Sequence, residues 1–150
     1  MKNIVAPIDF SRVTERILLI SSQLAHAFGS KVWLIHVVSP EPYPADYSAG
    51  PQSVRDNAAE KLKSAHQDLQ NQSRRLKEMG IAATALLVKG DVVDEITRHA
   101  KKVNADLVVM GEYGHSEVRD LIMGSAAKGM MKKHICPLLF LPADNSSDEA

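Results

Sequence analysis

The stretch Met110–Ala127, which reads MGEYGHSEVRDLIMGSAA, best indicates the fold of this chain. It begins at the end of a short apolar run, Leu107–Met110, and it ends where a helical pattern starts at Ser125. A short apolar run, a loop with glycines and then a helix are typical of the connection that follows a buried parallel strand. The stretch therefore predicts a strand, a loop and the start of a helix.

The glycines of this stretch suggest a site for an anion. Two residues separate Gly111 from Gly114, and nine separate Gly114 from Gly124 and Ser125. A helix N-terminus presents unpaired N–H groups and partial positive charge, and glycine lets a phosphate approach the backbone. Ser125 is a candidate to cap the helix or to give its hydroxyl to a phosphate. The spacing is neither a Walker A loop nor a dinucleotide fingerprint, so glycines that serve only turns and a cap remain an alternative.

Apolar runs alternate with amphipathic helical patterns along the rest of the chain. We expect strands at Lys2–Ile8, Lys31–Val38, Ala82–Val88, Leu107–Met110 and Pro137–Leu141. We expect helices from Ser11 or Thr14 to Phe28, from Val54 to Met79, from Asp91 to Val103 and from Ser125 to His134. This alternation, with nearly continuous apolar strands, predicts a single α/β domain of three layers with a parallel, doubly wound sheet.

Caps and faces follow from the same patterns. Ser11 and Thr14 are candidate N-caps of the first helix, Gly29 its C-cap, and Asp91 with Gly90 caps the third helix. The first helix is expected to bury Val13, Ile17, Ile20, Leu24 and Phe28. The long second helix is expected to bury Val54, Ala58, Leu62, Ala65, Leu69, Leu76 and Met79. Between these helices, the Pro-rich segment Ser39–Pro51 is expected to be a long loop.

Composition excludes several classes of protein. The 150 residues hold 18 Lys plus Arg against 18 Asp plus Glu, so no overall field favours nucleic acid or an anionic membrane. The single cysteine, Cys136, excludes a disulfide framework, and no apolar run is long enough to span a bilayer. We therefore expect a cytoplasmic protein with no membrane insertion and no nucleic-acid partner, with a domain over residues 1–142 and a polar tail over 143–150.

The chain resembles the universal stress protein family, in the branch that binds ATP through Gly-x2-Gly-x9-Gly-Ser/Thr. The segments that carry the resemblance are Ile4–Ser11, Val32–Val37, Gly90-Asp91, Ala105–Gly111, Gly111–Ser125 and Cys136–Leu139. They occur in the family's order over nearly the whole chain. The resemblance implies a Rossmann-like fold of the adenine nucleotide alpha hydrolase type, with strand order 3-2-1-4-5 and four helices. In that order, the ligand crevice lies between strands one and four.

The resemblance also implies a ligand and its contacts. The ligand is ATP, with Mg²⁺ bridging its phosphates. The residues that match the family's binding positions are Ala6, Pro7, Asp9, Val37, Met110, Gly111, Gly114, His115, Gly124, Ser125 and Ala126. Asp9 would bond the adenosine part, although it also suits the cap of a turn. Val37 would pack on the base, although a core valine would look the same.

Two residues depart from the family pattern. Glu112 and Tyr113 stand where the family more often has a small hydroxyl residue and then a basic one. Glu112 would place a negative charge near a triphosphate, which is unfavourable unless it points away or meets a metal ion. His115, Arg119 and Lys128 are the cations that could offset that charge.

No motif for catalysis is found in the sequence. His36, inside a strand, is expected to be a hydrogen-bonded core residue, and Cys136 an inert buried thiol.

The resemblance further implies a homodimer through antiparallel pairing of the last strand, Leu138, Leu139, Phe140 and Leu141, about a two-fold axis. An edge protected by Pro142 and the acidic tail is the alternative.

The leading hypothesis is an ATP-binding, nucleotide-responsive dimeric module of the stress response that acts on an unknown protein partner. The alternatives are a slow ATPase or autophosphotransferase, and a dimeric adaptor that binds no nucleotide.

Overall fold

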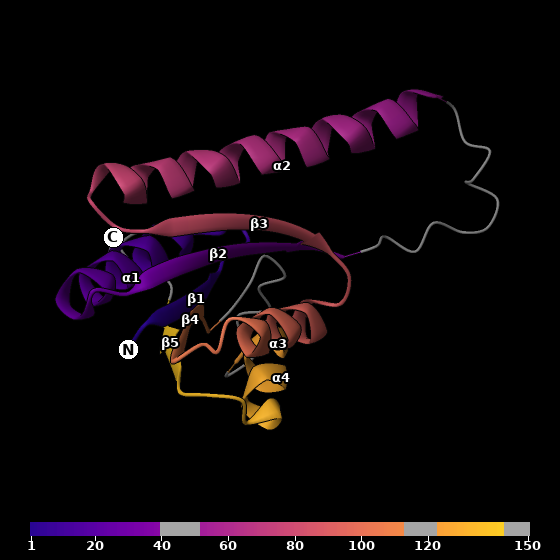
Figure 1. Cartoon of the computed structure of the whole chain (residues 1–150). Helices are drawn as coiled ribbons and strands as arrows, with labels where there is room; N and C mark the ends of the chain where they lie inside the picture. Colours follow the sequence, from indigo (N-terminus) through magenta and orange to yellow (C-terminus); the bar gives the residue numbers. More distant parts are fainter. Residues whose placement is uncertain (40–51, 113–122, 143–150) are drawn as a thin grey trace, which may run out of the picture.

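The computed structural model describes residues 1–39, 52–112 and 123–142, and for residues 52–58 it describes the backbone alone. Strands and helices alternate through the described chain (Figure 1). The elements are β1 (Asn3–Pro7), α1 (Thr14–Phe28), β2 (Lys31–Val38), α2 (Gln52–Glu78), β3 (Ala83–Lys89), α3 (Val92–Lys102), β4 (Leu107–Gly111), α4 (Ser125–Lys133) and β5 (Leu138–Leu141). Residues 40–51 of the predicted loop, and the tail 143–150, lie outside the described residues.

The strands form one parallel sheet in the order β3-β2-β1-β4-β5, which confirms the predicted order and fold class. Helices α1 and α2 cover one face of this sheet, and α3 and α4 cover the other (Figure 1). Alternate residues of β1 serve the two faces, since Ile4 and Ala6 pack toward α1 and Val5 packs toward α3. All three are 0% exposed. Burial on both faces explains why the strands read as continuous apolar runs.

Two of the predicted caps are confirmed and two are wrong. Gly29 ends α1 in the left-handed conformation, and the Asp91 carboxylate accepts a hydrogen bond from the Asp94 N–H at 3.0 Å. The N-cap of α1 is instead Val13, which makes no side-chain cap bond. The Thr14 N–H bonds the Ser11 carbonyl at 3.0 Å, and this turn places the N-cap at Val13, after Ser11 and just before Thr14, the first residue of the helix.

The buried face of α1 is rotated from the predicted one. In the second half of the helix, small residues are the buried ones: Ser21, Ser22 and Ala25 are 0%, 3% and 3% exposed. Phe28, expected to be inside, is 57% exposed, so that prediction is wrong. Small side chains let a helix lie close to its neighbours. In its second half, α1 therefore buries the face that carries small residues and not the face that carries the largest apolar residues.

Helix α2 is longer than the strand it covers. Its 27 residues span about 40 Å, whereas the seven residues of β3 span about 23 Å. The helix therefore projects past the sheet at its N-terminal end (Figure 1). Leu69 and Leu76 are buried as predicted. Leu62, nearer the projecting end, is 39% exposed, and Met79, just past the other end of the helix, is 58% exposed, so these two predictions are wrong.

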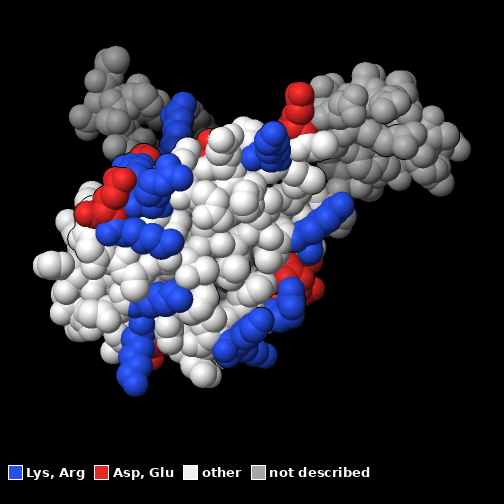
Figure 2. All heavy atoms as spheres, turned by 45° about the horizontal axis from the view of Figure 1, so that its top comes forward, with Lys and Arg blue, Asp and Glu red and all other residues white. Residues whose placement is uncertain are grey.

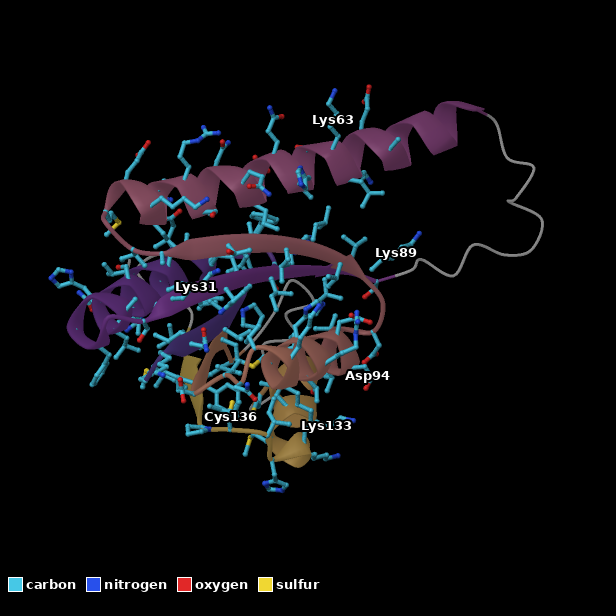
Figure 3. The ribbon with its side chains drawn as sticks, in the orientation of Figure 1. Lys31, Lys63, Lys89, Asp94, Lys133 and Cys136 are labelled. Atoms are coloured by element: carbon cyan, nitrogen blue, oxygen red, sulfur yellow. The ribbon has the colours of Figure 1, made fainter. Side chains whose placement is uncertain are left out.

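Helices α3 and α4 pack closely on the other face. A Cβ atom at Gly129 would lie only 2.6 Å from Cγ2 of Val93, so the two helices meet where α4 has no side chain. Lys133 and Asp94 reach toward each other from α4 and α3, with Nζ 3.6 Å from Oδ1 (Figure 3). Both side chains are exposed, so this ion pair adds little stability, and the packing at Gly129 sets where α4 lies.

Charged residues are mixed over the surface. On the face turned forward in Figure 2, Lys and Arg stand apart among uncharged residues, with Asp and Glu beside several of them. Over residues 1–39, 52–112 and 123–142, no helix combines the length and the apolar character that crossing a bilayer requires.

Replacing Gly129 with alanine tests the contact between α3 and α4. We expect Gly129→Ala to lower the free energy of unfolding by about 1 kcal/mol or more, because the overpacking cost exceeds the helix-propensity gain of about 1 kcal/mol. Urea denaturation measures the change. Val93→Ala in the same chain should recover most of the loss; a Gly129→Ala protein as stable as the wild type would contradict the contact.

Candidate functional site

A cleft of about 270 Å³ opens at the carboxyl ends of β1 and β4. The strand order reverses between these two strands, and α/β sheets bind their ligands at such a point. The cleft is lined from β1, β2, β4 and the first turns of α1, α3 and α4. The lining residues are Pro7, Ile8, Asp9, Val13, Ile17, Ile35, Val37, Val92, Ile96, Met110, Gly111, Glu112, Gly124, Ser125, Ala126 and Ala127.

Most of the walls are apolar. Ile35 and Val37 come from β2, and Val92 and Ile96 come from the first two turns of α3. The contribution of α3 to the cleft was not predicted from the sequence. The available signal was Asp91, whose cap fixes the start of α3 beside the strand ends. An apolar hollow with a few polar groups at one end is typical of a small-molecule site.

The polar end of the cleft is the N-terminus of α4. Gly124 is the N-cap and makes no side-chain cap bond, so the prediction that Ser125 caps the helix is wrong. The Lys128 N–H makes the first helical bond, to the Gly124 carbonyl at 3.1 Å. The N–H groups of residues 125–127 precede that bond and have no acceptor within the helix. These groups therefore offer the cleft hydrogen-bond donors and partial positive charge.

Backbone bonds join the end of β4 to the start of α4. The Glu112 N–H donates to the Leu141 carbonyl at 3.0 Å, and the Glu112 carbonyl accepts from the Gly124 N–H at 2.7 Å. The two segments that flank residues 113–122 are thus held together at the cleft. The same bonds connect the cleft to the end of β5, because Leu141 is the last residue of that strand.

The turn after β1 is fixed by Asp9 and His36. Asp9 Oδ1 accepts from the Ser11 N–H at 3.0 Å, so the turn-capping role expected of this residue is confirmed. His36 Nδ1 lies 2.8 Å from the Ile8 carbonyl oxygen, and its ring lies 4.9 Å from that of Phe10. His36 is therefore a hydrogen-bonded structural residue, as predicted. Phe10 takes a positive φ of 60°, which turns the chain sharply toward α1.

The structure brings together most of the residues that the sequence proposed for the site. Those that line the cleft are Pro7, Asp9, Val37, Met110, Gly111, Gly124, Ser125 and Ala126. Ala6 is fully buried in the core and does not line the cleft. Gly114 and His115 lie outside the described residues, as do Tyr113 and Arg119. That these residues bind a nucleotide stays a prediction.

Cys136 lies away from the cleft, just before β5 (Figure 3). Its thiol is half-buried, and burial raises its pKa, with the charge of Asp106 acting in the same direction. A raised pKa keeps the sulfur protonated and poorly nucleophilic near neutral pH, which agrees with the expected inert role.

Comparison with known proteins identifies the relatives of the chain. A family model described as the universal stress protein family matches residues 1–142. The universal stress protein MJ0531 of Methanocaldococcus jannaschii is 30% identical over 139 residues, which cover 92% of this chain and 80% of that protein.

Solved structures show the same fold. The structure of MJ0577 from Methanocaldococcus jannaschii superposes with a TM-score of 0.81 at 24% identity, covering 97% of this chain and 98% of that one. A universal stress protein of Archaeoglobus fulgidus, solved in complex with dAMP, has a TM-score of 0.67 at 20% identity, covering 93% and 97%.

Changing Asp9 separates its hydrogen bond from its charge. We expect Asp9→Ala to lower the free energy of unfolding by about 1 kcal/mol, because the Ser11 N–H loses its acceptor. Asp9→Asn keeps a side-chain oxygen and should lose less than half of that. Urea denaturation compares the two variants, and equal losses would mean that the negative charge, not the acceptor, stabilises the turn.

Proposed function

The chain belongs to the universal stress protein family, and on this premise we propose that its cleft binds ATP and that the protein acts as a nucleotide-responsive dimeric module. The observation that carries the proposal is the N-terminus of α4, whose first N–H groups lie at one end of a largely apolar cleft. Donor N–H groups at one end and apolar walls elsewhere suit a ligand with an apolar, flat part and an anionic part. A nucleotide has both.

The two parts of the nucleotide are assigned to opposite ends of the cleft. The base packs between apolar side chains that include Val37, and Asp9 accepts from the adenosine part. The phosphates lie at Gly111, Gly124 and the N–H groups of residues 125–127, where glycine leaves room for close approach. The Archaeoglobus fulgidus relative that was solved with dAMP supports an adenine nucleotide as the ligand class.

A Mg²⁺ ion would be held chiefly by the nucleotide. Among the described residues, no group of three or more His, Cys, Asp or Glu side chains is placed to hold a metal ion. The cleft does contain carboxylates, Asp9 and Glu112, which are the hard oxygen ligands that Mg²⁺ accepts. The ion would therefore arrive on the phosphates, keep much of its water, and neutralise phosphate charge.

The dimer is assigned to β5. This strand is at the edge of the sheet, and Leu138, Leu139 and Phe140 are only half-buried. An exposed apolar edge favours pairing with a second strand, and an isologous contact about a two-fold axis closes it. The Glu112 N–H bond to the Leu141 carbonyl links this strand to the cleft, so a bound nucleotide can act on the dimer surface through a single hydrogen bond.

We do not extend the proposal to catalysis. Apart from Asp9 and Glu112, the described lining residues carry no ionisable side chain that could act as acid, base or nucleophile.

We place the protein in the cytoplasm as part of the proposal, since its one cysteine does not indicate an oxidising compartment.

Calorimetric titration with ATP and Mg²⁺ tests the binding site. We expect micromolar affinity for the wild type and a loss of about tenfold or more in Ser125→Asp, whose carboxylate repels phosphate. Asp is favourable in the first turn of a helix, so this variant should fold at least as well. Ser125→Ala is the matched control and should lose little, because it keeps the backbone donor. A folded wild type that binds no nucleotide would favour the adaptor hypothesis.

Light scattering after size-exclusion chromatography tests the dimer. The bonds from Val108 N–H to the Pro137 carbonyl and from Glu112 N–H to the Leu141 carbonyl show that odd-numbered residues of β5 face β4. The Leu138 N–H then faces the free edge. We expect Leu138→Pro, at the first residue of the strand, to yield monomers, while Leu138→Val stays dimeric. A dimeric Leu138→Pro protein would place the interface elsewhere.

A further inference from the structure

The ionisable side chains of the cleft have a single sign. Of the described residues that line it, only Asp9 and Glu112 have ionisable side chains, and both are acids. Lys128 is in the first turns of α4, but its side chain is exposed and does not line the cleft. Among the described residues, the positive contribution comes from the helix N-termini whose first turns line the cleft, those of α1, α3 and α4.

Glu112 is held next to the N-terminus of α4. Its carbonyl oxygen is 2.7 Å from the N–H nitrogen of Gly124, the N-cap of α4, and its own N–H is bonded to β5. Its backbone is therefore fixed from both sides. Whichever rotamer the side chain takes, the carboxylate stays within about 8 Å of the α4 N-terminus, where salt does not fully screen it.

The charge balance then depends on the ligand. Among the described residues, helix N-termini are the positive groups and Asp9 and Glu112 the negative ones, and this balance suits a nucleotide with little phosphate charge. A free triphosphate carries several negative charges to a point beside Glu112, and like charges at such a distance repel strongly where water is partly excluded. A divalent cation on the phosphates removes most of the repulsion and replaces it with attraction to the carboxylate.

We infer that Glu112 makes this cleft select nucleotides by the net charge of their phosphates. Without a divalent cation, the order of affinity is AMP above ADP above ATP, and a divalent cation raises the affinity for ATP most. Glu112 is the residue that determines this selectivity. The inference rests on the proposed function, because it concerns the same cleft.

Calorimetric titrations of the full chain with AMP, ADP and ATP test the inference, each in EDTA and each with excess Mg²⁺. In EDTA, we expect wild-type protein to bind ATP about tenfold more weakly than AMP, and Glu112→Gln to remove most of that difference. Mg²⁺ should strengthen ATP binding much more in the wild type than in Glu112→Gln. Glu78→Gln, an exposed change at the end of α2, is the matched control and should behave as the wild type.

The outcomes separate this inference from the proposed function. If Glu112→Gln binds Mg²⁺-ATP but keeps the wild-type ratio of ATP to AMP affinity in EDTA, the role of Glu112 is refuted and the ATP site stands. If folded wild-type protein binds neither AMP nor Mg²⁺-ATP, both proposals fail. Thermal melting of each variant confirms that it is folded, as expected for a change that leaves the Glu112 backbone bonds in place.

Discussion

The structure depends on the complete enclosure of β1. This strand has a neighbour on each edge and helices on each face, and Ile4, Val5 and Ala6 are all fully buried. A parallel strand enclosed in this way must receive its two neighbours through connections that run to opposite sides of the sheet. The carboxyl ends of β1 and β4 then diverge above the sheet, and the cleft is the space that this divergence leaves.

Two kinds of element finish the cleft. The strands supply apolar walls, because they are already buried on both faces and can carry only such residues there. The helices add apolar side chains such as Val92 and Ile96 and, at the N-terminus of α4, polar groups, because the first N–H groups of a helix have no acceptor within it. The donors of α4 and the carboxylate of Glu112 have opposite electrostatic character, and the hydrogen bond from the Gly124 N–H to the Glu112 carbonyl holds the two segments together at the site.

Sequence patterns predicted the fold well and the details of packing less well. The alternation of apolar runs and amphipathic helices, together with the family resemblance, gave the strands to within about two residues and the sheet order. The predictions for Ser11, Thr14 and Phe28 were wrong because they depend on the exact course of α1. The turn from Ser11 to Thr14 decides where the helix starts, and packing against distant strands decides which face it buries.

For this protein, the sequence by itself determined the class of fold, its order of elements and the glycine-serine segment before α4, because these follow from local periodicity and from residue types that only certain backbones accept. The tertiary structure decided which residues share the cleft. Pro7, Val37, Ile96 and Ala126 come from four different elements, and only the packing of α3 and α4 onto the strand ends brings them together. It also decided the position of Glu112, through two hydrogen bonds to residues far along the chain.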